Sequence, residues 1–109
     1  MEIKKIIFEL GLKVFAEGQN SSFYEGYTSD LLSDVMANCK EGSVWITIQR
    51  HMNVIAVAQL KKIAGIILPN GISPDDQVKI RAKDEGIYIL GTQDNAFEVS
   101  GKIYSLLKK

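Results

Sequence analysis

The stretch over residues 43–72 constrains the fold more than any other part of the chain. Apolar runs rich in β-branched residues lie at 44–48 and 66–68, and such runs are typical of buried strands. The segment between them is long enough for a crossover helix, expected over about 53–62, and a polar turn at 49–53 precedes that helix. A strand, a helix and another strand in this order predict parallel strands in an α/β fold.

The chain before this unit predicts one helix, two short strands and a second helix. An apolar stripe at the spacing of a helix face ends at Gly11, which favours a helix stop; the stripe consists of Ile3, Ile6, Ile7 and Leu10. Short strands are expected at 12–16 and 23–27. Ser29 is a good N-cap for a helix that ends near Asn38.

The chain after this unit continues the alternation of helices and strands. Ser73 and Pro74 mark a helix start, and Gly86 marks its end. A strand at 87–90 and a helix at about 94–107 complete the pattern. We therefore predict a compact single domain over residues 1–109, with a short, mainly parallel sheet and helices on both faces.

Composition argues against several classes of partner and location. The 109 residues carry a net charge of zero, so the basic surface that nucleic acid requires is missing. No apolar run approaches the roughly 20 residues that cross a bilayer. The lone cysteine, Cys39, cannot form an internal disulfide, and the N-terminal residues lack the apolar core of a signal peptide. We expect a cytoplasmic protein that binds neither nucleic acid nor membrane.

Three polar turns follow predicted strands and form the candidate ligand site. In an open α/β sheet, ligands bind beyond the carboxyl ends of the strands, next to helix N-termini. The candidate residues are Arg50, His51, Asn53, Asn70, Gly71, Thr92, Gln93 and Asp94. This mixture suits a small polar or anionic ligand. The alternative is structural, because Asn53, Ser73, Thr92 and Asp94 are all placed to cap helices.

Several single residues, inside and outside this set, could have either a functional or a purely structural role. Arg50 beside His51, the only histidine, suits a phosphate or a carboxylate, and a solvated turn histidine is the alternative. Cys39 has no second cysteine or histidine at ligand spacing, so neither a metal nor another cofactor is expected. Asp30 and Asp34 share a predicted helix face, which is usually only solvated.

Motifs for catalysis are missing from the sequence. There is no Gly-x-Gly, no phosphate-binding loop that ends in Gly-Lys-Ser/Thr, and no Gly-x-Ser-x-Gly. No nucleophile, base and orienting group can be assembled from these residues. We therefore expect a protein that is not an enzyme.

The predicted crossover helix also suggests self-association. Its apolar face includes alanines small enough for close approach, either to the sheet or to a second subunit. A homodimer is the expectation, with contacts through Trp45, Val54, Ile55, Val57 and Ala58.

Three segments together resemble the DRTGG domain family. They lie at residues 26–36, 45–51 and 96–99, and an opening helix at 6–12 is also similar to the start of such domains. The family's Asp-Arg turn corresponds here to Arg50-His51, with Asn53 at a later acidic position. Its Thr-Gly-Gly corresponds to Pro69-Asn70-Gly71, and its Asp-Thr-Phe to Asn95-Ala96-Phe97.

This resemblance implies a fold and a class of function. The fold would be an α/β domain like the N-terminal domain of HPr kinase, a type also fused to CBS pairs, to pyrophosphatases and to phosphotransacetylases. Such domains are regulatory and often dimeric, and some similar small proteins are associated with iron hydrogenase systems. The expected function is a non-catalytic regulatory or assembly module acting as a homodimer, in a hydrogenase or another redox or metabolic complex. The alternative is a sensor for a small anion or nucleotide.

Overall fold

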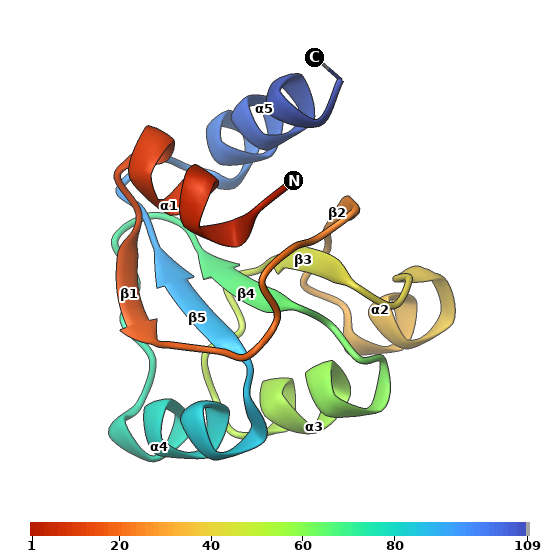
Figure 1. The fold of residues 1–109 in the computed structure, drawn as a ribbon. Helices are drawn as coiled ribbons and strands as arrows, with labels where there is room; N and C mark the ends of the chain where they lie inside the picture. Colours follow the sequence, from red (N-terminus) through yellow and green to blue (C-terminus); the bar gives the residue numbers. More distant parts are fainter. Residues whose placement is uncertain (109) are drawn as a thin grey trace.

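Five short strands form one mixed sheet in the order β1-β5-β4-β3-β2 (Figure 1). The computed structural model describes residues 1–108. The strands are β1 (Lys13–Ala16), β2 (Glu25–Thr28), β3 (Ser43–Ile46), β4 (Gly65–Leu68) and β5 (Tyr88–Gly91). Strands β2 to β5 are parallel, and β1 pairs antiparallel with β5 at one edge. The predicted short, mainly parallel sheet is confirmed.

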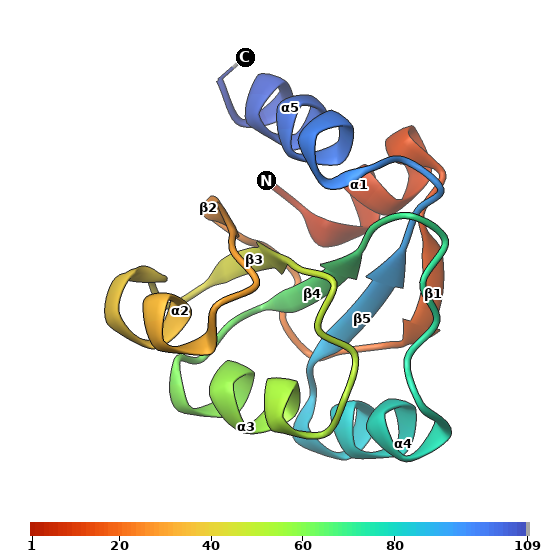
Figure 2. The same cartoon turned by 180° about the vertical axis from the view of Figure 1, so that it is seen from behind.

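Helices cover both faces of this sheet, as predicted. They are α1 (Ile3–Leu10), α2 (Leu32–Asn38), α3 (Asn53–Leu60), α4 (Asp76–Glu85) and α5 (Ala96–Leu107). Helices α1 and α5 lie on one face, and α2, α3 and α4 lie on the other, as the two opposite views in Figure 1 and Figure 2 show. A parallel sheet needs both faces covered, which explains the continuous apolar runs of its strands.

Side chains that alternate along each strand divide the core into two layers. Trp45 and Ile66 point toward α2, α3 and α4, whereas Val44 and Ile67 point toward α1 and α5. This follows from the two-residue period of a strand. The three inner strands β3, β4 and β5 are therefore buried on both faces, whereas the edge strand β2 is mostly exposed.

The residues predicted to contact a second subunit belong to the layer under α3. Trp45, Val54, Ile55, Val57 and Ala58 are all buried within the chain's own core. Their side chains pack between α3 and the sheet, so they present almost no surface to another protein. This corrects the predicted contact residues, because the close approach allowed by the alanines is used to bring α3 onto the sheet.

Helices α2 and α4 start later in the chain than the predicted capping residues Ser29 and Ser73 indicated. Helix α2 starts at Leu32, and the Ser29 hydroxyl accepts a hydrogen bond from the Leu31 N–H in a turn before it. Helix α4 starts at Asp76, with Asp75 rather than Ser73 at the N-cap position. Ser73 and Pro74 therefore lie in the segment before the helix, and the Ser73 carbonyl accepts a hydrogen bond from Arg50 at 3.4 Å.

Other helix boundaries agree with the sequence. Gly11 and Gly86 end α1 and α4 in the left-handed conformation, as predicted. Helix α5 starts at Ala96, where Asn95 and Glu98 form a reciprocal capping box with bonds of 2.9 and 3.0 Å. Within residues 1–108, none of the helices combines the length and the apolar character needed to cross a membrane.

Asp34 joins α2 to the edge strand β2. The phenol of Tyr27 donates to its carboxylate at 2.9 Å, and so does the Asn38 amide. The pKa of Asp34 is lowered by hydrogen bonds from Ser29 first, then Asn38 and Tyr27. A carboxylate with a lowered pKa stabilises the folded state most at a pH above its unfolded value, and this stabilisation is lost as the pH falls through the folded value.

We expect the Asp34→Asn variant to be less stable than the wild type at neutral pH. The difference should shrink as the pH falls below 3.8, the ordinary value for this carboxyl. Urea unfolding at a series of pH values measures both quantities. A difference that stays constant across the acid range would show that the ionised carboxylate does not contribute.

Candidate functional site

The three predicted turns lie at one edge of the sheet. They follow β3, β4 and β5, which are neighbouring parallel strands, so their carboxyl ends meet (Figure 2). The structure divides the candidate residues into two groups. The turns after β4 and β5 bind each other, while the turn after β3 contacts the segment before α4.

Backbone hydrogen bonds join the turns after β4 and β5. The Asn70 N–H donates to the Asp94 carbonyl at 2.8 Å, and the Gly71 N–H donates to the Thr92 carbonyl at 2.9 Å. Both Asn70 and Gly71 have positive φ angles, of 61° and 69°. An added Cβ at Gly71 would meet only the end of the flexible Gln93 side chain, at 2.8 Å. The positive φ angle is therefore what favours glycine at this position.

Asp94 is engaged by groups of its own chain. Its carboxylate accepts a hydrogen bond from Lys102 at 2.6 Å, and this bond raises the pKa of Lys102. Its N–H donates to the Thr92 hydroxyl at 3.2 Å. Thr92 and Asp94 therefore stabilise the turn, and the N-cap of α5 is the neighbouring Asn95.

Arg50 and His51 belong to the second group. The Arg50 guanidinium donates to the Ser73 carbonyl at 3.4 Å, and His51 Nδ1 lies 2.9 Å from the Asp75 carboxylate. Asn53 is the first residue of α3 rather than its cap, and its side chain is exposed. The two groups meet only through the segment at 70–75, which belongs to both.

Asp30 fixes the start of the turn after β3. Its carboxylate accepts hydrogen bonds at 2.9 Å from the buried Thr47 hydroxyl and from the Ile48 N–H. The Gln49 amide donates to the Asp30 carbonyl, also at 2.9 Å. Asp30 was expected on a solvated helix face, and it instead lies before α2 and holds the residues that lead to Arg50.

A cavity of about 360 Å³ opens beside the first group. It is lined by Gly71, Ser73, Thr92 and Gln93, and by Lys13 and Phe15 from β1. The amino groups of Lys13 and Lys79 lie 5.0 and 5.7 Å from the centre of the Phe15 ring. No carboxylate is among the residues that line this cavity. Its charge and its hydroxyl and amide groups suit an anion.

The sequence did not identify Lys13 and Phe15 as site residues. They lie two positions apart in a short predicted strand, and the sequence pattern does not show which neighbouring strand this strand pairs with. Pairing of Lys13 with Gly91 across β1 and β5 brings them to the carboxyl edge. The sequence does not reveal that β1 runs antiparallel to β5, and without this direction Lys13 cannot be placed at the carboxyl edge.

The described residues offer little for catalysis or metal binding. Residues 1–108 contain no group of three His, Cys, Asp or Glu side chains that could hold a metal ion. Cys39 is buried in the layer under α3, and burial raises the pKa of its thiol. His51 pairs with Asp75 at the surface, and no side chain that could act as a nucleophile is hydrogen-bonded to His51 within the described part of the chain.

The outer face of α5 is a second candidate surface. Phe97 and Tyr104 are 88% and 64% exposed, and Gly101 lies between them along the helix. A hollow of about 340 Å³ is lined by residues of α5 and of the edge strand β2. Its lining is mostly apolar and includes Ile46, Ile103 and Leu107. We call Phe97, Gly101 and Tyr104 the α5 stripe.

A comparison with protein families decides what kind of domain this is. The family model described as the DRTGG domain matches residues 27–106. The chain belongs to the DRTGG domain family. The match starts within β2 and ends within α5, so this DRTGG domain carries α1 and β1 in addition to the matched part.

A solved structure has the same fold as this DRTGG domain. It contains the CBS and DRTGG domains of the regulatory region of Clostridium perfringens pyrophosphatase, complexed with its activator diadenosine tetraphosphate. The TM-score is 0.71 at 15% sequence identity, over 92% of this chain and 44% of that one. This chain thus spans less than half of the length of its neighbour. No curated protein sequence matches closely enough to count as a relative.

Proposed function

We propose that this DRTGG domain is a non-catalytic regulatory module that acts as a homodimer through the α5 stripe. The exposed Phe97 and Tyr104 on one helix face carry the proposal. Large apolar side chains exposed together are typical of protein interfaces. The neighbouring DRTGG domain belongs to a regulatory region, which supports a regulatory role for this one as well.

The spacing of the stripe suits a second copy of the same helix. Its residues lie four and three positions apart, so they share one face of α5. An added Cβ at Gly101 would meet nothing within 4 Å, so the helix is bare at this point. In a two-fold interface each patch meets itself, which would let Phe97 of each copy cover the bare Gly101 of the other.

We expect the Phe97→Glu variant to be monomeric under conditions in which the wild type is a dimer. A buried carboxylate without a partner is costly, so the charge opposes association. Light scattering after size exclusion would give twice 12.1 kDa for the wild type and 12.1 kDa for the variant. The matched control is Ile80→Glu, because Ile80 is exposed on α4 at the opposite face of the sheet. A wild type that stays monomeric at micromolar concentration would contradict the proposal.

The setting of the module is a further part of the proposal. An iron hydrogenase or another redox or metabolic complex in the cytoplasm is the expected context, and a pull-down from the native cell would test it. A buried, unpaired cysteine is compatible with a reducing compartment.

A second candidate function is a sensor for a small anion or nucleotide at the carboxyl edge of the sheet. The cavity lined by Lys13, Ser73 and Thr92 favours it, because it combines a cation with hydroxyl groups and has no carboxylate in its lining. We call it the anion cavity after this proposed role. The predicted contacts Arg50 and His51 lie across the segment at 70–75 from this cavity. The activator bound to the neighbouring structure makes diadenosine tetraphosphate a suitable first probe.

We expect the Lys13→Ala variant to lose stabilisation by an anionic ligand. A ligand at 100 times its dissociation constant stabilises a protein by about 2.7 kcal/mol, which a thermal-shift screen of nucleotides and metabolic acids detects. The Lys83→Ala variant, at an exposed lysine on α4, is the control. If Arg50→Ala loses the ligand-induced thermal shift and Lys13→Ala keeps it, the ligand binds at the turn after β3 instead. A screen without any shift would contradict the sensor function.

A further inference from the structure

The largest of the cavities described lies at the opposite edge of the sheet, at the amino ends of the strands. It measures about 560 Å³, within the range of small-molecule sites. Its walls come from the link between β1 and β2, from the ends of α3 and α4, and from the residues before β3. We call it the amino-edge hollow. It shares no lining residue with the cavity at the carboxyl edge.

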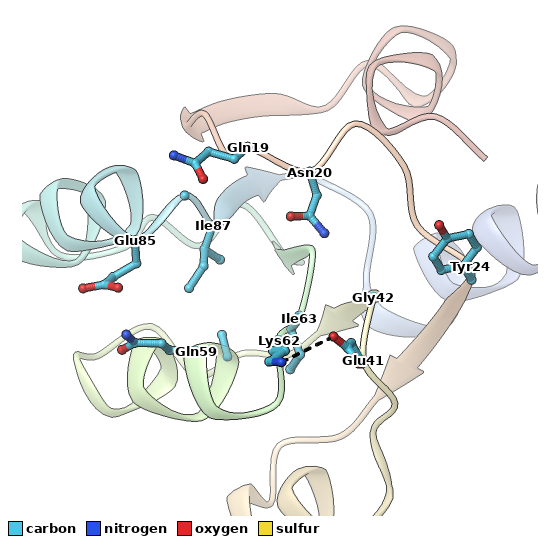
Figure 3. A pocket seen from close by; sticks show the side chains of 12 residues that line it. Gln19, Asn20, Tyr24, Glu41, Gly42, Gln59, Lys62, Ile63, Glu85 and Ile87 are labelled. Atoms are coloured by element: carbon cyan, nitrogen blue, oxygen red, sulfur yellow. Dashed lines mark ion pairs between the residues drawn. The ribbon is translucent and has the colours of Figure 1, made fainter.

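The amino-edge hollow has an apolar floor. Ile63 and Ile87 are nearly buried beneath it, and Ala58 contributes from α3. In Figure 3 the side chains of Ile63 and Ile87 lie toward the middle of the lining residues. Such a floor favours the flat or aliphatic body of a ligand over a fully hydrated ion.

Three side-chain amides surround this floor. They belong to Gln19, Asn20 and Gln59, and none of them makes a side-chain hydrogen bond to another residue within 1–108. Each amide offers a donor and an acceptor side by side. The complementary partner is a group that also presents a donor beside an acceptor, as the edge of a nucleobase does.

The charges around the hollow are already paired. Glu41 lies 3.9 Å from Lys62, and Glu85 lies 3.3 Å from Arg81. Figure 3 shows Glu85 and Gln59 at one side of the hollow and Glu41 and Tyr24 at the other. Glu41, Glu85 and Lys62 line the hollow, and Arg81 lies outside the lining. The lining therefore has no excess of positive charge for a phosphate, and both carboxylates already have a cation beside them, which favours an uncharged ligand.

An aromatic ring completes the lining. Tyr24 is 73% exposed, and one edge of its ring lies against Gly42, with the nearest ring carbon 3.0 Å from the position of an added Cβ. Exposed aromatic side chains stack on the faces of heterocyclic bases. An apolar floor, free amides and an accessible ring together match a flat heterocycle with polar edges.

We propose that the amino-edge hollow binds an uncharged planar heterocycle of the purine class, either as the base or as the nucleoside. Asn20 and Gln59 bind its polar edge, Ile63 and Ile87 support its face, and Tyr24 stacks on its exposed part. The phosphate groups of a nucleotide contribute nothing at this site. The proposal is independent of the anion cavity, which lies at the other end of the strands.

Titration of the ¹⁵N-labelled chain with adenosine and guanosine tests this proposal. At least one of the two should shift the side-chain amide signals of Asn20 and Gln59 and the N–H signals of Gly42 and Gly86. Asn20→Ala and Gln59→Ala should each weaken this binding about three- to tenfold, as expected for a lost hydrogen bond. Both residues are exposed, so the variants should fold. Gln77→Ala is the matched control, because Gln77 is an exposed amide on α4 outside the hollow.

Three results would overturn the proposal. The first is that neither nucleoside shifts these signals at millimolar concentration. The second is that the shifts occur but are unchanged in both alanine variants. The third is that AMP binds much more tightly than adenosine at the same residues, because recognition would then depend on charge.

Discussion

Replacing Trp45 with alanine is expected to cost about 3–5 kcal/mol of the free energy of unfolding. Trp45 is fully buried at the centre of β3, and its indole N–H donates to the Ser29 carbonyl at 2.8 Å. The substitution leaves a large cavity between α3 and the sheet and also removes the partner of a carbonyl. Domains of this size have a total stability of about 5–15 kcal/mol. Denaturant unfolding followed by far-UV circular dichroism measures the loss.

Two further variants separate the contributions of Trp45. Trp45→Phe keeps most of the bulk and loses the hydrogen bond, so its cost should be about 1–3 kcal/mol. Phe8→Ala removes an aromatic ring that is 87% exposed on α1, and such surface changes usually stay within about 0.5 kcal/mol. A cost for Trp45→Ala no larger than that of Phe8→Ala would contradict the placement of Trp45 in the core.

Replacing Gly18 with alanine is expected to destabilise the chain by about 1–3 kcal/mol or more. Gly18 lies in the link between β1 and β2, where it crosses the start of β5. An added Cβ would lie 2.5 Å from the Tyr88 nitrogen and 2.8 Å from the Gly86 oxygen. Both atoms belong to backbone, and the neighbouring Gln19 N–H is bonded to the same Gly86 oxygen at 2.9 Å. The link therefore has to move away from β5 to make room.

Gly101→Ala is the matched control for this substitution. An added Cβ at Gly101 meets nothing within 4 Å, and alanine is favoured over glycine inside a helix by about 0.5–1 kcal/mol. The stability of both variants should be measured by denaturant unfolding, at a protein concentration at which the chain is monomeric. Equal stabilities would mean that the link at Gly18 does not lie against β5.

Local sequence signals predicted most of the fold. The stripe that ends at Gly11 and the apolar runs of β3 and β4 each carry their own periodicity or stop signal, and these elements formed as expected. The start of α4 differs from the prediction: Asp75, not Ser73, occupies the N-cap position, and the Asp75 side chain contacts His51, which lies 24 positions earlier in the chain. A contact over such a distance leaves no mark in the local pattern.

The contact residues and the site residues were harder to predict, for a related reason. An apolar face such as that of Val54 and Ile55 has the same pattern whether it meets a sheet or a second subunit. The polar turns were correctly expected at one edge, since parallel neighbours share their carboxyl ends. Lys13 joins them only through the antiparallel pairing of β1, and Asn20 and Gln59 meet only through the folded chain. Such groupings depend on tertiary structure alone.

Strand β5 connects the two cavities directly. Four residues, Tyr88–Gly91, separate Ile87 in the amino-edge hollow from Thr92 in the anion cavity. At about 3.3 Å per residue, the strand is roughly 13 Å long. Hydrogen bonds to β4 on one side and to β1 on the other fix its position along its axis. One short strand therefore holds the two cavities at a fixed distance from each other.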